Sequence, residues 1–152
     1  MSYIQSIHHI IIRTKYNRNV IPNKHSEELY RYIWGYIKNK KSFLYRINGV
    51  QDHIHVLVGI HSTIALANFV KDLKISSNSW LKSQKVKFPY FESWGKGYAA
   101  FTVQYQGKEG VISYVKNQRE HHKRESFQDE YRRLIKENGI EIDERFFLDD
   151  QE

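Results

Sequence analysis

The 152-residue chain contains no cysteine and no long hydrophobic run. Without cysteine it can build neither a disulfide framework nor a thiolate metal site, and the absence suits a reducing cytoplasm. No apolar stretch approaches the roughly 18–20 residues that cross a bilayer. The opening "MSYIQSIHHI" does not lead from a charged segment into a long apolar one. We therefore expect a cytoplasmic protein with no signal peptide and no membrane partner.

Positive charge is abundant and unevenly spread. The formal net charge is +7, yet residues 139–152 hold six of the 17 acidic residues and one of the 24 basic ones. The 23 basic and 11 acidic residues that remain give residues 1–138 a charge of +12. A body this basic favours a polyanionic partner, usually nucleic acid, over the alternative that the charge serves solubility. We predict one domain over 1–138 and an acidic tail over 139–152, which folds back or docks on a neighbouring subunit.

Hydrophobic periodicity predicts alternating strands and helices. Strands are expected over 6–14, 43–50, 53–60 and 98–106, and helices over 26–40, 63–84, 110–123 and 127–138. Ser26 is the expected N-cap of the first helix and Gly139 the expected C-cap of the last. The dipeptide "QD" between the two middle strands suggests a hairpin. The order β-α-β-β-α-β predicts an α+β, ferredoxin-like split βαβ fold: an antiparallel sheet with helices on one face and extra C-terminal helices.

The strand "HIHVLVG" carries two histidines among apolar residues. Because side chains alternate along a strand, His53 and His55 leave the same face, about 6.6 Å apart at their backbones. Ile54 and Val56 would fill the opposite face. Two buried imidazoles need partners for their nitrogens. They are either satisfied structural histidines or two ligands of one metal ion, and a third ligand would decide between these readings.

The predicted helix "GVISYVKNQREHHK" offers such a ligand. Tyr114 and Gln118 are four residues apart, so they lie about 40° apart on one helical face. His121 falls near the same stripe. A tyrosine there is more often a core residue with its hydroxyl tied to the backbone, and a glutamine is more often a surface residue.

The combination of these motifs resembles a known family. His53-Ile54-His55 is similar to the histidine–hydrophobic–histidine (HUH) motif, and "SYVKNQ" is similar to the tyrosine helix that accompanies it. Together they resemble the single-tyrosine transposases of the smallest insertion sequences, the two-hundred type, and their relatives associated with repetitive extragenic palindromes. "RTKYNR", "WGKGYAAFTV" and "NQREHH" also occur in the family's order.

The resemblance implies an enzyme that cuts and rejoins hairpin-bearing single-stranded DNA with a divalent cation, Mg²⁺ or Mn²⁺. It implies that His53, His55 and Gln118 hold the metal and that Tyr114 attacks the scissile phosphate, forming a 5′-phosphotyrosine. Imidazole suits Mn²⁺ better than Mg²⁺, so the metal stays open. It further implies a homodimer, in which the tyrosine helix of one subunit completes the other's site, although some relatives are monomers.

Two further sets of residues are hypotheses from position. His121 and His122 follow the tyrosine closely and are candidates for proton transfer, since a phenol must lose its proton before it attacks. Basic clusters that could grip phosphates follow the first strand and lie on the long helix and the tyrosine helix. Their members are Arg13, Lys15, Arg18, Lys71, Lys74, Lys116 and Arg119.

Two alternatives stay open. A non-catalytic single-stranded nucleic-acid-binding module of the RNA-recognition type shares this fold, and "KGYAAFTVQY" approximates its aromatic strand with Tyr98 and Phe101 as stacking platforms. That match fails at Ala100, where an aromatic residue is expected, and leaves the histidines unexplained. A metal-dependent hydrolase would need carboxylates beside the histidines, and only Asp52 is close in sequence.

Overall fold

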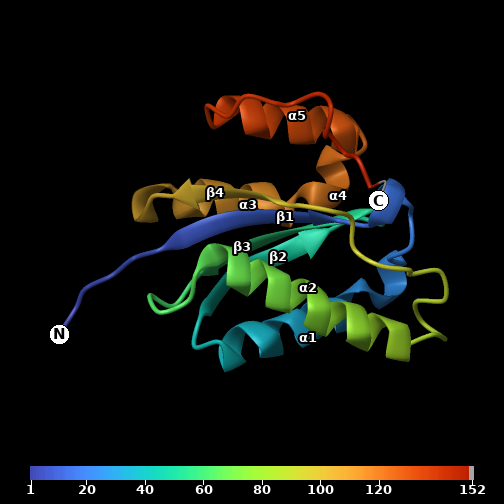
Figure 1. The fold of residues 1–152 in the computed structure, drawn as a ribbon, viewed down its shortest axis with the longest axis horizontal. Helices are drawn as coiled ribbons and strands as arrows, with labels where there is room; N and C mark the ends of the chain where they lie inside the picture. The colour runs from blue at the N-terminus through green and yellow to red at the C-terminus, as the bar shows by residue number, and fades with distance from the viewer. Residues whose placement is uncertain (151–152) are drawn as a thin grey trace.

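The computed structural model describes residues 1–150, and Gln151 and Glu152 lie outside the described part. Four strands form one antiparallel sheet in the order β2-β3-β1-β4 (Figure 1). They are β1 (Ile7–Arg13), β2 (Phe43–Gly49), β3 (His53–Gly59) and β4 (Ala99–Val103). The helices are α1 (Ser26–Asn39), α2 (Leu66–Ser83), α3 (Lys108–Lys116), α4 (Gln118–His121) and α5 (Phe127–Glu137), with short 3-10 turns η1 (Lys15–Asn17), η2 (Asn23–His25) and η3 (Tyr105–Gly107). Within residues 1–150, no helix combines the length and apolar character that a membrane span requires.

The larger core lies between the sheet and helices α1 and α2. On β1 and β3 the residues facing it are alternate and aliphatic, with Ile10 and Ile12 beside Ile54 and Val56. Leu29 and Ile33 of α1 and Phe69 and Leu73 of α2 close this core at full burial. The apolar residues of each helix recur every three or four positions, so each helix has one apolar side, which packs against the sheet.

The opposite face of the sheet is covered by the C-terminal helices, with α5 lying across it (Figure 1). Its smaller apolar cluster joins Ile11 and Phe101 of the sheet to Phe127, Tyr131 and Leu134 of α5. The expected α+β fold with appended C-terminal helices is therefore confirmed. The histidines of β3 point toward this second face, because His55 pairs with Ile11 in the antiparallel register.

Two local predictions were wrong. The helix expected over 110–123 is interrupted at Asn117, whose φ of −95° and ψ of 17° separate α3 from α4. Ser26 is not an N-cap: it is already helical, and its hydroxyl donates to the carbonyl of Asn23 instead of accepting from the helix. Gly139, by contrast, has the expected left-handed conformation after α5, with a φ of 74°.

The segment after α5 folds back over the domain. Phe147 and Leu148 pack against the smaller apolar cluster, and Asp150 is buried. In Figure 1 the end of this segment lies beside the turn that follows β1. The domain boundary at residue 138 stays a prediction, and of the predicted acidic tail Glu152 lies outside the described residues.

Candidate metal centre and tyrosine site

His53 and His55 are fully buried side chains at the start of β3. Their rings lie with centroids 5.1 Å apart, on the face of the sheet that α5 covers. Buried imidazoles are costly unless their nitrogens are paired. The partners that the structure gives them define the site.

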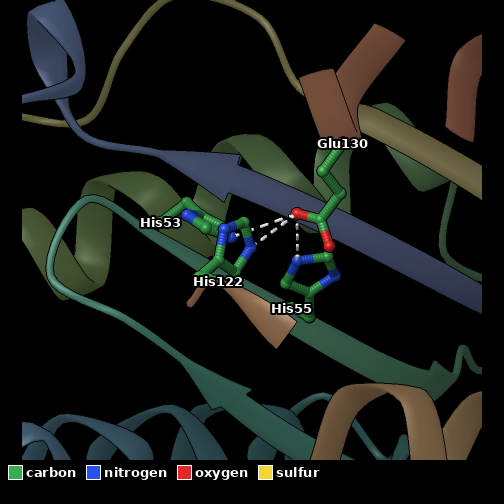
Figure 2. Close-up of side chains that lie close together, drawn as sticks. All are labelled: His53, His55, His122 and Glu130. Carbon is green, nitrogen blue, oxygen red and sulfur yellow. Dashed lines mark hydrogen bonds and ion pairs between the residues drawn. The ribbon is translucent and has the colours of Figure 1, made fainter. Parts of the chain in front are cut away.

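Three imidazoles converge on one carboxylate oxygen (Figure 2). Glu130 Oε1 lies 3.3 Å from His53 Nε2, 3.2 Å from His55 Nε2 and 3.0 Å from His122 Nε2. Glu130 comes from α5, His122 from the residue after α4, and the other two from β3. Folding thus brings three separate segments to one buried point, which we call the His–Glu cluster.

Further polar groups orient the cluster. Asp52 Oδ1 lies 2.7 Å from His53 Nδ1, so this ring can donate to Asp52 and present Nε2 to the centre. His9 Nε2 and His55 Nδ1 are 2.7 Å apart and fix the second ring in the same way. Gln118 is buried in the cluster, with its amide oxygen 3.4 Å from His53 Nε2 and its amide nitrogen donating to Glu130 Oε2 at 3.1 Å.

Burial and pairing set the charges of these groups. Burial alone would raise the pKa of Glu130, but hydrogen bonds from His122, His53 and His55 hold it well below its usual range. Burial would lower the pKa of His53, yet its bonds to Asp52 and Glu130 raise it overall. Burial lowers the pKa of His55 to about 4 and that of His9 to about 3. A buried carboxylate therefore lies among imidazoles, a setting that a bound cation would stabilise further.

The donor set fits a divalent metal ion. One ligand atom from each of His53, His55, His122 and Glu130 lies within 4.8 Å of the other three, at a buried position. Imidazole nitrogen and carboxylate oxygen suit first-row divalent ions, and the carboxylate adds the oxygen ligand that Mg²⁺ or Mn²⁺ requires. Gln118, the third ligand implied by the family resemblance, also lies at this point. The structure adds two candidate ligands that the resemblance did not imply, Glu130 and His122.

Tyr114 lies at the edge of the same cluster. Its hydroxyl donates a short hydrogen bond to Glu130 Oε2, and Arg133 Nη2 donates to the phenolic oxygen at 2.9 Å. Burial and the neighbouring carboxylate raise the pKa of Tyr114, and Arg133 offsets this only in part. A cavity of about 470 Å³ opens beside the ring and is lined by Phe101, Arg133 and Leu134 among others. The tyrosine thus lies with the histidines of its own chain.

The two histidines proposed for proton transfer have different surroundings. His122 Nε2 faces Glu130 inside the cluster. His121 Nε2 lies 2.6 Å from Glu125 Oε1, and its ring is 5.3 Å from the ring of Tyr114. His122 therefore lies among the candidate metal ligands, and His121 lies beside the tyrosine.

The basic residues predicted to bind DNA divide into two groups. Lys71, Lys116 and Arg119 are exposed, and so is Arg18, which pairs with Glu92. Lys15 is half-buried beside the ring of Tyr16. The other two members of the set are engaged inside the protein.

Arg13 and Lys74, the other two predicted DNA-binding residues, are bonded to groups inside the protein. Arg13 is 4% exposed and paired with Asp150. Lys74 Nζ donates to the carbonyls of Gly95 and Gly97 at 2.8 and 2.5 Å, and burial lowers the pKa of this amine to about 8. Neither side chain meets a ligand without a rearrangement of the protein groups that it now binds.

The aromatic residues that suggested an RNA-recognition module do not form an open platform. Phe101 is 6% exposed and packs under α5, while Tyr98 precedes β4 and is 36% exposed. The sheet face that carries stacking aromatics in such modules is here the face covered by α5.

Sequence reasoning missed Glu130. A charged residue in an amphipathic helix is usually solvent-exposed, and α5 is otherwise rich in charge. The signal was its position, because Glu130 falls in the stripe of Phe127, Tyr131 and Leu134, where only apolar residues are expected. An acidic residue in a buried stripe needs a partner, and the histidines supply it.

Fold and site together define an α+β protein in which a buried His–Glu cluster, able to hold a metal ion, adjoins a tyrosine. The chain belongs to the IS200-like transposase family, whose model matches residues 2–118. The resemblance inferred from the HUH motif and the tyrosine helix is thereby confirmed.

Solved structures agree on the fold. A candidate transposase from Deinococcus radiodurans R1 is 23% identical, with a TM-score of 0.61 over 77% of this chain and 93% of that one. A REP-associated tyrosine transposase bound to a REP hairpin is 9% identical, with a TM-score of 0.56 over 77% of this chain and 68% of that one. At these identities the likeness supports the fold alone. A comparison with curated proteins finds no match.

Proposed function

We propose that this transposase cleaves and rejoins single-stranded DNA at hairpin-bearing ends through a 5′-phosphotyrosine on Tyr114. The observation that carries the proposal is the hydrogen bond from the Tyr114 hydroxyl to Glu130, the residue on which His53, His55 and His122 converge. Within residues 1–150, the tyrosine that contacts the candidate metal centre is Tyr114, which the family resemblance assigns as nucleophile. The hairpin-bound relative supports a hairpin substrate.

The candidate ligands are His53, His55, His122 and Glu130, with the amide oxygen of Gln118 in reach. A divalent ion bound there, Mg²⁺ or Mn²⁺, would polarise the scissile phosphate and offset the charge that develops on its oxygens. Asp52 and His9 would keep the two strand imidazoles turned toward the ion.

The chain's own groups handle the tyrosine proton. The Tyr114 hydroxyl already donates to Glu130, so this carboxylate is the nearest acceptor, and His121 lies alongside the ring. Arg133 donates to the phenolic oxygen and would stabilise negative charge there. As Tyr114 Oη forms its bond to phosphorus, the bond to the 3′ oxygen breaks, and that oxygen leaves as a 3′-hydroxyl after taking a proton. Rejoining reverses these steps and needs no ATP.

Because Tyr114 and the histidines of one chain already adjoin, this site does not need a tyrosine from a second subunit. A homodimer remains part of the proposal because the family resemblance implies it, and a cytoplasmic location remains part of it because the composition of the chain suggests it.

The test is intact-mass spectrometry after mixing the protein with Mn²⁺ and single-stranded oligonucleotides copied from both flanks of its gene. We expect a protein–DNA adduct with the wild type and none with Tyr114→Phe. Tyr105→Phe, which alters an exposed tyrosine of η3, is the matched control and should still form the adduct. Adduct formation by Tyr114→Phe, or no adduct with either flank, would contradict the proposal. A purely DNA-binding module would bind these oligonucleotides without Mn²⁺ and form no adduct.

A further inference from the structure

A buried carboxylate from the end of the described chain occupies a site built for an anion. Asp150 accepts hydrogen bonds from Arg13 Nη1 at 2.5 Å and Arg13 Nη2 at 2.9 Å. The backbone N–H groups of Tyr16 and Lys96 also donate to it, both at 2.7 Å. Its side chain has no exposed surface. We call the four donors from Arg13, Tyr16 and Lys96 the anion cradle.

The donors of the cradle all come from segments other than the one that fills it. Tyr16 and Asn17 both adopt left-handed backbone conformations, with φ of 56° and 53°, which is costly for residues other than glycine. A Cβ at Gly95 would lie 2.5 Å from Arg13 Nη1, so this glycine makes room for the guanidinium. Lys74 fixes the same loop through the carbonyls of Gly95 and Gly97. The strained backbone and the close packing together hold these donors so that they point to one position.

The cradle lies next to the His–Glu cluster. Arg13 pairs with His53 across β1 and β3, so their side chains leave the same face of the sheet. Beside the cradle, the ring of Tyr16 is half exposed, with Arg18 5.1 Å and Lys15 5.4 Å from its centroid. A cavity of about 280 Å³ adjoins Arg13 and Lys96. An anion site, an exposed aromatic ring and two cations together match the phosphate and base of a nucleotide.

We propose that the anion cradle binds a backbone phosphate of single-stranded DNA, and that Asp150 is an internal competitor for it. A guanidinium that grips two carboxylate oxygens can grip two phosphate oxygens with the same geometry. The two backbone donors add contacts that either anion satisfies. This deepens the proposed function, on which it rests for the identity of the strand.

The competing segment is held at other points, so Asp150 can leave while the rest stays docked. Arg132 makes two hydrogen bonds to Glu144, at 2.6 and 2.9 Å, and stacks 3.9 Å from the ring of Phe147. If Asp150 left and nothing replaced it, the buried guanidinium of Arg13 would lose its ion-pair partner, which is costly. A phosphate that enters as Asp150 leaves removes that cost, so the two anions exchange rather than bind together.

The experiment measures binding of a fluorescein-labelled 20-nucleotide oligothymidylate by anisotropy, without divalent ions and in a Tyr114→Phe background. We expect Asp150→Asn to bind about tenfold more tightly, because one charge-assisted contact to phosphate becomes available. Its log–log salt slope should steepen by about 0.7, the contribution of one more neutralised phosphate on a single strand. Asp149→Asn makes the same charge change at an exposed neighbour and should match neither effect.

A double variant, Arg13→Gln with Asp150→Asn, removes both charges, so we expect it to fold because no unpaired charge is left buried. It should lose the gain in affinity and the added salt slope. Inorganic phosphate should raise the melting temperature of Asp150→Asn more than that of the wild type. Equal gains for Asp150→Asn and Asp149→Asn, or a gain that survives in the double variant, would overturn the proposal.

The outcomes are independent of the chemistry of Tyr114. A normal DNA adduct in the wild type, with affinities that do not respond to Asp150, would remove the phosphate site and leave the proposed function intact. If Asp150→Asn shows the expected gains in affinity and salt slope but no oligonucleotide forms an adduct, the phosphate site stands and the proposed strand transfer by Tyr114 is contradicted.

Discussion

At the scale of single residues, two adjacent histidines have different partners and should have different roles. His122 faces Glu130 in the His–Glu cluster, while His121 lies between Glu125 and the ring of Tyr114. We expect His122→Ala to lower the affinity for Mn²⁺ at least about tenfold, because a candidate ligand is lost. His121→Ala should leave that affinity unchanged and slow formation of the DNA adduct about 100-fold, the usual effect of removing a proton-transfer group.

Calorimetric titration with Mn²⁺ and a time course of adduct formation separate the two histidines, and each variant is the control for the other. Unchanged adduct formation in His121→Ala would rule out its part in proton transfer. Equal metal affinity in His122→Ala and the wild type would exclude it as a ligand.

The sequence was informative about residues where a short-range rule applied. The two-residue period of a strand placed His53 and His55 on one face, and the structure has them there. Tyr114 and Gln118, four residues apart, both reach the same cluster, although the helix is interrupted between them at Asn117. Helical spacing marks Glu130 as a buried position of α5, but its partners lie in β3 and after α4, and only tertiary packing reveals them.

At the scale of elements, the structure differs from the prediction at a junction that the sequence does not mark, the break between α3 and α4. No proline or glycine occurs between Val111 and Lys123, so the pattern favours one continuous helix. The break at Asn117 coincides with the burial of Val115 on one side and of Gln118, bonded to Glu130, on the other. Tertiary contacts of these two residues outweigh helix continuity. The hairpin between β2 and β3, by contrast, was predicted because its turn residues are local.

Helix α5 carries Glu130, so its stability bears on the site. Ser126 caps this helix by accepting a hydrogen bond from the backbone N–H of Asp129 at 3.2 Å. We expect Ser126→Ala to lower the free energy of unfolding by about 1 kcal/mol, the usual cost of losing such a cap. Urea denaturation measures the change. Ser79→Ala, at an exposed interior position of α2, should leave stability unchanged or raise it slightly. A Ser126→Ala variant as stable as Ser79→Ala would show that the cap contributes nothing.

At the scale of the whole molecule, charge is arranged so that an acidic segment closes onto a basic body. The opposite signs of 139–152 and 1–138 are readable in the sequence, and the return of the tail was one of the two expected arrangements. The sequence does not say which acidic side chain meets which cation. The structure pairs Glu144 with Arg132 near the surface and Asp150 with Arg13 in the interior. Only the second pair is buried enough to affect stability strongly.

The Asp150–Arg13 pair makes the stability of the whole domain depend on pH. Burial tends to raise the pKa of Asp150, but hydrogen bonds from Arg13, Lys96 and Tyr16 lower it from 3.8 to about 2. Because the folded pKa lies below the unfolded one, this carboxylate stabilises the fold above about pH 4, by about 2 kcal/mol. That contribution is lost as the pH falls from about 4 through about 2, and it is absent below about pH 2, where both states are protonated.

Asp150→Asn removes this contribution at every pH. We therefore expect urea denaturation to show a difference of about 2 kcal/mol between wild type and variant at neutral pH, shrinking as the pH falls from about 4 toward 2. Asp149→Asn separates the loss of one negative charge from the loss of the buried pair. A difference that stays constant down to pH 2, or that Asp149→Asn reproduces, would mean that the fold does not depend on an ionised Asp150. A shrinking difference, seen only for Asp150→Asn, would establish that the ionised Asp150 stabilises the fold through its buried pair with Arg13.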